Sequence, residues 1–159
     1  MIELASGHRA QTILRRIRQQ PETLRQVFLC SPFIDAKHRT ALCDVIARCR
    51  SVQTGVTILT TTGAAGAMLS LMAGASRRWS CAIVPIPGLH AKAYLAIGRS
   101  SYRSEGLISS CNLTNAGTQL NLEIGVYFTS DSPAGSRLLS QTMSFVSNAL
   151  RGALTCARV

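Results

Sequence analysis

The sequence predicts an α/β fold in which a mixed β-sheet carries helices on both of its faces. Helix-like and strand-like segments alternate through the first half of the 159-residue chain, as they do in β-α-β units. The second half holds three strand-like runs joined without helices, which favours a mixed rather than a purely parallel sheet. No repeat, low-complexity segment or linker interrupts this order, so we expect residues 1–159 to form a single domain.

The elements of the first half are predicted from periodicity and from turn residues. A basic amphipathic helix covers 8–20, where Ile13, Leu14 and Ile17 lie at helical spacing, and Pro21 ends it. Apolar and β-branched runs between turn residues predict the strands. The elements that follow are a strand at 26–33, a helix at about 36–50 for which Asp35 is the expected cap rather than a catalytic acid, a strand at 55–62, a short helix at 63–75 and a strand at 79–86.

The second half reads as three strands followed by one helix. The strand-like runs are HAKAYLAI at 90–97, GLISSCN at 106–112 and LEIGVYFT at 122–129, with a polar turn at 99–105. We expect no helix between these runs, because the connecting segments are short. The last helix covers about 133–151 and has apolar residues at helical spacing.

The composition favours a folded domain that binds a polyanion. Lys and Arg number 17 against 7 Asp and Glu, and 47% of the residues are hydrophobic. A small domain with a net charge of +10 typically meets nucleic acid, with an anionic membrane surface as the second choice. No apolar run is long enough to span a bilayer and the N-terminus lacks a signal-peptide pattern, so we expect a cytoplasmic protein without a membrane partner.

The cysteines and acidic residues indicate no metal centre. The six cysteines contain no Cys-x-x-Cys pair and several lie in apolar runs, so we expect reduced, buried thiols. The sequence also lacks a carboxylate cluster for magnesium, which argues against a two-metal nuclease. We therefore expect no metal and no cofactor.

Polar residues recur at alternate positions of the three neighbouring runs. His90 and Lys92 share a strand face that Tyr94 continues, because side chains two residues apart point the same way. The opposite face is apolar and belongs to the core: Leu89, Ala91, Ala93 and Leu95. A lysine is rarely buried without a partner, so the His90 face should lie at an edge, a cleft or an interface.

The next two runs add further polar pairs. Ser110 and Asn112 share a face, and so do Asn121 and Glu123. Together the runs supply the groups that phosphodiester chemistry needs. Histidine can attack phosphorus, a second histidine can protonate the leaving oxygen, and lysine and asparagine can hold the remaining oxygens. Glutamate can accept the proton on the far imidazole nitrogen and so fix the ring, whereas Ser110 either joins this site or only shapes a turn.

The segments HAKAYL, SSCNLTNAG and NLEIGV, in this order, resemble the phospholipase D superfamily. The resemblance is carried by His90-x-Lys92, Ser110-x-Asn112 and Glu123, and it extends over residues 25–130. It implies a phospholipase D-like sandwich and a metal-independent phosphodiesterase with these five catalytic residues. One departure is that Ile97 and Gly98 stand where the fuller signature has an aspartate, which we take to be a structural position.

The resemblance also implies a homodimer. The active site of the family uses two copies of the motif and this chain has one. His8 and His38 lie in basic helical segments and have no suitable lysine. The two His90 side chains would then face each other across a two-fold axis, one as the nucleophile and the other as the general acid.

The expected function is sequence-nonspecific endonuclease cleavage of nucleic acid, DNA rather than RNA. Arg15, Arg16 and Arg18 are either a solvated helix face or a nucleic-acid-binding face, and we favour the second reading slightly. No segment of the sequence is a candidate for entering a DNA groove and recognising bases there. Targeting or regulation would therefore come from a partner protein, as in restriction or defence systems. The alternatives are a phospholipid phosphodiesterase or transferase and a catalytically silent nucleic-acid-binding scaffold.

Overall fold

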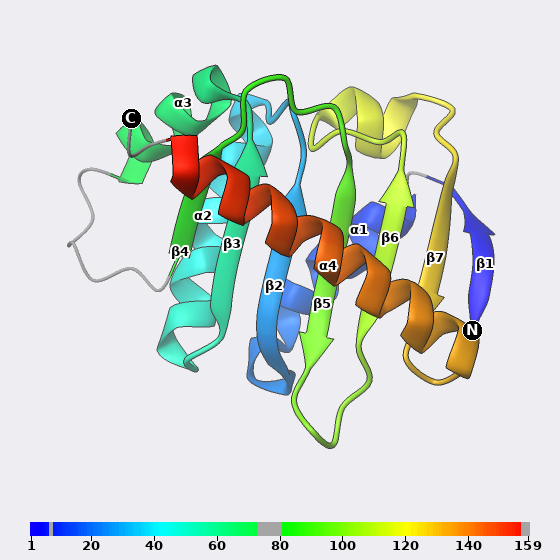
Figure 1. Cartoon of the computed structure of the whole chain (residues 1–159). Coiled ribbons are helices and arrows are strands. Elements are labelled where there is room, and N and C mark those ends of the chain that lie inside the picture. Colours follow the sequence, from blue (N-terminus) through cyan, green and yellow to red (C-terminus); the bar gives the residue numbers. More distant parts are fainter. Residues whose placement is uncertain (7, 73–80, 157–159) are drawn as a thin grey trace.

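The computed structural model describes residues 1–6, 8–72 and 81–156, with side chains described up to residue 153. Its centre is a seven-stranded sheet with the strand order β1-β7-β6-β5-β2-β3-β4 (Figure 1). The strands are β1 (Ile2–Ala5), β2 (Leu24–Cys30), β3 (Gly55–Thr60), β4 (Cys81–Pro85), β5 (Ala93–Gly98), β6 (Glu105–Ser109) and β7 (Gly125–Thr129). The pairs β2–β3 and β3–β4 are parallel and the other four are antiparallel, so the predicted mixed α/β sheet is confirmed.

Helices cover both faces of this sheet, as predicted. The elements are α1 (His8–Gln19), α2 (Ala36–Ser51), α3 (Thr62–Met72) and α4 (Pro133–Cys156), with a 3-10 turn η1 (Pro21–Thr23) and a π-helical turn η2 (Ala116–Leu120). Helices α1 and α2 pack on one face, and α4 crosses the other face alone, from β7 to β4 (Figure 1).

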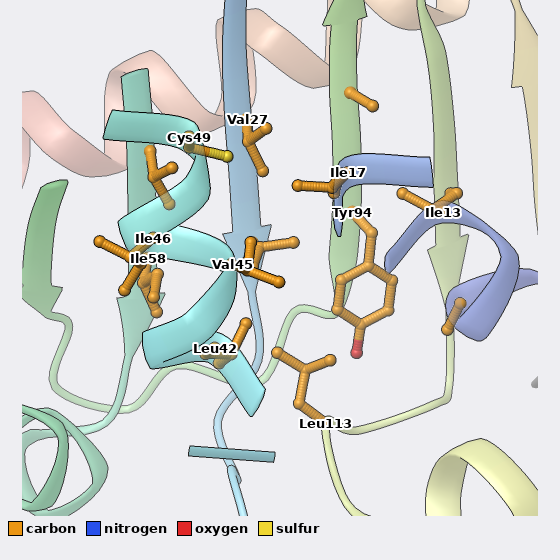
Figure 2. Close-up of a cluster of buried hydrophobic side chains, with 14 of the residues drawn as sticks. Ile13, Ile17, Val27, Leu42, Val45, Ile46, Cys49, Ile58, Tyr94 and Leu113 are labelled. Atoms are coloured by element: carbon orange, nitrogen blue, oxygen red, sulfur yellow. The ribbon is translucent and has the colours of Figure 1, made fainter. Parts of the chain in front are cut away.

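The larger core lies under α1 and α2. Figure 2 shows Ile13 and Ile17 of α1 converging with Val45 and Ile46 of α2 on the side chains of the central strands. The helical spacing of these apolar residues is what places them on one stripe of each helix. Tyr94 of β5 enters this cluster and is completely buried. This corrects the expectation that Tyr94 continues an exposed polar face, because helices of the same chain cover that face.

The smaller core lies under α4. Leu139 and Val146 of this helix pack over Leu95 and Phe128 of the sheet, and Leu89 packs at its margin. The predicted apolar face of the 89–97 segment is therefore confirmed, since residues 89, 91, 93, 95 and 97 all belong to this side. Each strand alternates between the two cores, as the pleat requires.

Three predicted boundaries were wrong. The runs at 90–97, 106–112 and 122–129 are longer than the strands, because their ends are extended chain that reaches past the paired part of the sheet. The turn η2 occupies a segment expected to contain no helix, and β1 was not predicted. Residues 73–75 of the predicted helix and 79–80 of the predicted strand lie outside the described residues.

Candidate active site

Five predicted site residues gather at one edge of the sheet. Strands β5 and β7 begin at this edge and β6 ends there, since neighbouring strands of this part run antiparallel (Figure 1). His90 and Lys92 immediately precede β5, Ser110 and Asn112 follow β6, and Glu123 lies two residues before β7. The strands therefore position these side chains without containing them.

Backbone hydrogen bonds hold the three segments in register beyond the strands. The N–H of Ser109 donates to the carbonyl of Lys92 at 3.1 Å, and the N–H of Ser110 donates to the carbonyl of Ile124 at 3.0 Å. These bonds extend the ladder just far enough to fix the backbone of the site. The side chains beyond them remain accessible, and the His90 side chain is exposed.

His90 and Lys92 interact directly. The Lys92 Nζ lies 3.3 Å from Nδ1 of His90 and also donates to the His90 carbonyl at 2.8 Å. An ammonium can only donate, so Nδ1 is the acceptor in this contact. A ligand that draws the ammonium away would free the lone pair of Nδ1.

Glu123 is held by neighbours of its own segment and of the β6 end. The Ser110 hydroxyl donates to Oε2 of Glu123, and the Asn121 amide donates to Oε1 at 3.4 Å. The backbone N–H of Ile124 donates to the Ser110 oxygen at 3.2 Å. The structure gives no hydrogen bond between Glu123 and His90 of the same chain within its described residues, so the expected contact of this carboxylate with the imidazole is not formed here.

Asn112 carries an unsatisfied acceptor. Its Oδ1 atom is buried and has no hydrogen-bond partner among the described residues. A buried amide oxygen without a donor costs free energy, and such atoms are uncommon outside functional sites. Gly117 lies against the Asn112 backbone, where a Cβ atom would approach the Asn112 carbonyl oxygen to 2.7 Å. The turn η2 thus requires glycine at this position to support Asn112.

A buried layer that sequence reasoning missed pins the segment after β6. The Tyr94 hydroxyl donates to the carbonyl of Cys111, and the N–H of Leu113 donates to the Ser31 oxygen at 3.0 Å. Burial raises the pKa of the Cys111 thiol to about 12, and the nearby Glu123 carboxylate acts in the same direction. Cys111 is therefore a neutral packing residue directly behind the site.

Asp35 completes this support. Its side chain caps α2 by accepting from the N–H of His38, as predicted, and it also accepts from the N–H of Asn115 at 2.6 Å. Burial by itself raises the pKa of Asp35, but these two backbone bonds and the His38 ring outweigh it and lower the pKa to about 2. The residue ties the start of α2 to the loop that carries Asn112.

A cleft opens beside His90 and Lys92. Its volume is about 510 Å³, and it lies between the beginning of β5, the end of β6 and one side of α4. The α4 residues that line it are Leu138, Gln141, Thr142 and Phe145. This wall could not be predicted from the sequence, because its residues lie 15 or more positions after Glu123 and reach the cleft only through the fold.

The three arginines predicted to bind nucleic acid do not share one environment. Arg15 and Arg18 are exposed beside a groove between α1 and α2. Arg16 instead reaches the sheet, where Nη1 lies 2.7 Å from Oε1 of Glu105, a carboxylate that is only 2% exposed and also accepts from Tyr127. Arg16 thus supports the fold through a buried carboxylate, and its contact with nucleic acid stays a prediction. Glu105, expected in a polar turn, begins β6.

The missing aspartate of the signature has a structural explanation. Ile97 is buried in the core under α4, and Gly98 lies so close to the 99–104 turn that a Cβ atom would meet the Tyr102 carbonyl oxygen at 2.1 Å. Both residues are at the end of β5 opposite to His90. The substitution therefore concerns packing far from the predicted chemistry.

Three general properties bear on the predicted class. Within the described ranges, no three His, Cys, Asp or Glu side chains are grouped so that they could hold a metal ion. No described helix combines the length and the apolar character needed to cross a bilayer. The five cysteines whose side chains are described are all unpaired.

Comparison with known proteins identifies the fold. No family model and no curated protein matches the sequence. Among solved structures, NucT from Helicobacter pylori is similar with a TM-score of 0.64 and 13% identity, over 95% of this chain and 96% of that one. Nuc from Salmonella typhimurium, a phospholipase D family member, gives 0.58 and 14% over 95% and 92%. Phosphatidylserine synthase from Haemophilus influenzae gives 0.59 and 13% over 79% of this chain and 33% of that one. The chain thus has the phospholipase D-like fold, as predicted.

Proposed function

From this fold, we propose that the chain is a metal-independent phosphodiesterase, specifically a sequence-nonspecific endonuclease that cleaves DNA. The observation that carries the proposal is the edge of the sheet where His90, Lys92, Asn112 and Glu123 meet. The fold likeness to Nuc and NucT over nearly the full length of all three chains supports it. The net charge of +10 favours a phosphate-rich polymer.

The proposed reaction proceeds in two displacements. A phosphate oxygen first attracts the Lys92 ammonium away from His90, and an imidazole nitrogen then attacks phosphorus. A nitrogen–phosphorus bond forms, the bond from phosphorus to the leaving oxygen breaks, and a second histidine protonates that oxygen. Water then attacks phosphorus, gives its proton to the second histidine and releases His90. Lys92 and Asn112 would offset the charge of the phosphate oxygens throughout.

The second histidine is the reason for proposing a homodimer. His8 and His38 belong to α1 and to α2. Next to Glu123, the apolar side chains of Leu122 and Ile124 are 103% and 67% exposed. Large apolar side chains exposed close together in one segment are typical of contact surfaces. A second copy placed here would cover them and bring its own His90 to the shared site.

Cleavage in a chelator is the primary test of the proposed function. Plasmid and single-stranded DNA are incubated with the protein in EDTA, beside His90→Ala and the matched histidine control His8→Ala. We expect the wild type and His8→Ala to cut DNA and His90→Ala to be inactive. A strict requirement for added magnesium, or hydrolysis of phosphatidylcholine without any effect on DNA, would contradict the proposal.

The shared site has its own test. Wild-type and His90→Ala chains are mixed, dissociated and reassociated, and the activity is compared with the expected fraction of wild-type pairs. Because each site would need two His90 residues, mixed pairs should be inactive. Sedimentation must also show a dimer, and an active monomer would rule the arrangement out.

A further inference from the structure

The cleft beside His90 has a composition that the phosphodiesterase chemistry alone does not require. Lys92 and His90 form its polar end, whereas most of the remaining wall is apolar. Phe145 of α4 is 47% exposed and Ile108 of β6 is 40% exposed, and both line the cleft. Large apolar side chains left half-exposed beside a polar site indicate a ligand part with an apolar surface.

The polar groups on the α4 wall indicate the chemical class of that ligand. The Thr142 hydroxyl is buried and already donates to the Leu138 carbonyl at 2.8 Å. The Gln141 amide is exposed at the cleft, and the structure gives it no hydrogen bond within the described residues. No charged residue of α4 lines the cleft. The wall therefore offers an aromatic face and one group that both donates and accepts hydrogen bonds.

A nucleobase has the complementary chemistry. Its face stacks on aromatic side chains regardless of sequence, and its edge pairs with amides. The amide of glutamine can present its donor or its acceptor to different bases, so such a contact adds little sequence discrimination. A lipid acyl chain would fill the apolar part but would leave the Gln141 amide facing hydrocarbon.

We propose that the cleft binds the base adjacent to the scissile phosphate, stacked on Phe145 and hydrogen-bonded by Gln141. This inference rests on the proposed function and specifies its substrate. A base inside a duplex is paired and stacked on both sides and cannot enter without being flipped out. The preferred substrate is therefore single-stranded DNA, or a duplex where its strands separate.

The experiment removes the base and the aromatic ring separately. Cleavage in EDTA is measured on a single-stranded oligonucleotide, on the same strand built entirely of abasic tetrahydrofuran units, and on the duplex. The proteins are the wild type, Phe145→Ala, Phe145→Tyr and Tyr102→Ala, an exposed aromatic of the 99–104 turn at the opposite edge of the sheet.

We expect the effects of removing the base and of removing the Phe145 ring on the cleavage rate to be non-additive. The wild type should cut the normal strand about 10–100-fold faster than the abasic one, the range that one stacking contact provides. Phe145→Ala should lose the same factor on the normal strand and nothing on the abasic strand. Phe145→Tyr should keep the activity, because a tyrosine ring stacks equally well, and Tyr102→Ala should match the wild type.

A second variant and a binding assay distinguish loss of the base contact from misfolding or loss of turnover. Gln141→Ala changes an exposed helical side chain to the best helix former, so its folding is secure. We expect it to cut the normal strand several-fold more slowly and the abasic strand at the wild-type rate. His90→Ala protein, which cannot turn over, should still bind the normal strand about 10–100-fold more tightly than the abasic strand.

The outcomes separate the two proposals. Failure of the wild type to cut any DNA overturns the proposed function, and the binding assay then decides on the base subsite. Cutting of normal and abasic strands at equal rates, faster cutting of the duplex, or an unaffected Phe145→Ala overturns the subsite alone. Loss of short-chain phosphatidylcholine hydrolysis in Phe145→Ala, with DNA cleavage unchanged, assigns the cleft to an acyl chain and also overturns it.

Discussion

Strand β6 has a polar cluster at each end. The polar groups are paired within the protein at one end and largely unpaired at the other. At its beginning, the buried carboxylate of Glu105 is bound by Arg16 and by the Tyr127 hydroxyl. At its end, the partner of the Lys92 ammonium among the described residues is its neighbour His90 alone, and the Oδ1 atom of Asn112 has no partner among them. A polar group that is fully paired inside the protein stabilises the fold, whereas one left without a partner is available to a ligand.

The largest expected effect is a loss of stability when the paired cluster is disrupted. Arg16→Ala would leave the Glu105 carboxylate buried without its cation, which typically costs about 3–5 kcal/mol of the free energy of unfolding. The neighbouring Arg15 is exposed, so Arg15→Ala should change the free energy of unfolding by less than about 0.5 kcal/mol. Urea unfolding measures both variants. Equal midpoints for the two would mean that the Arg16–Glu105 pair does not support the fold.

A substitution in the cluster at the end of β6 should lower the activity and leave the stability unchanged. Lys92→Ala removes the proposed donor to the phosphate, and the loss of one such donor typically lowers kcat by about 10²–10³. The urea midpoint should remain that of the wild type, because among the described residues the Lys92 side chain makes hydrogen bonds to His90 alone. Steady-state cleavage and unfolding are measured on the same preparation. A lowered midpoint would assign Lys92 to the fold.

An intermediate effect is expected at Asp35, which caps α2 and binds the loop after β6. Asp35→Ala should lower the free energy of unfolding by about 1–2 kcal/mol, as for other lost helix caps. Because its folded pKa of about 2 lies below the ordinary value, the contribution is present above pH 4 and declines as the pH falls toward 2. The difference between wild type and variant should therefore shrink over this range. A constant difference would show that the carboxylate charge is not involved.

The smallest effect is expected at Ser110, whose hydroxyl donates to the Glu123 carboxylate. Ser110→Ala removes one hydrogen bond worth about 1 kcal/mol, so activity should fall about fivefold. Ser110→Thr keeps the hydroxyl and should restore most of it. A loss as large as that of Lys92→Ala would instead place the Ser110 hydroxyl in direct contact with substrate.

The sequence predicted what depends on local periodicity. The alternation of residues 89–97 between two faces and the capping role of Asp35 were confirmed, since both follow from a few neighbouring residues. The ends of the strands were not predictable, because His90 and Lys92 have the alternating sequence pattern of a strand although β5 begins only at Ala93. Pairing is decided by other segments of the sheet.

Contacts between distant residues could not be predicted from the sequence. Arg16 and Glu105 are 89 positions apart, and nothing in the helical pattern of residues 8–20 distinguishes Arg16 from Arg15. Tyr94 follows the polar alternation of His90 and Lys92, but α1 and α2 cover it. The apolar wall of the cleft depends on where α4 crosses the sheet. Such facts become visible only when the chain is folded.

Helix α4 has a consequence for incomplete chains. It covers one whole face of the sheet and also forms one wall of the cleft. A polypeptide that stops before Pro133 would lose the catalytic cleft and at the same moment present Leu95, Phe128 and their neighbours to water. Chaperones and proteases recognise such surfaces, so a prematurely terminated product would be removed as misfolded protein. Completion of the last helix thus closes the cleft and covers this face of the sheet in the same step.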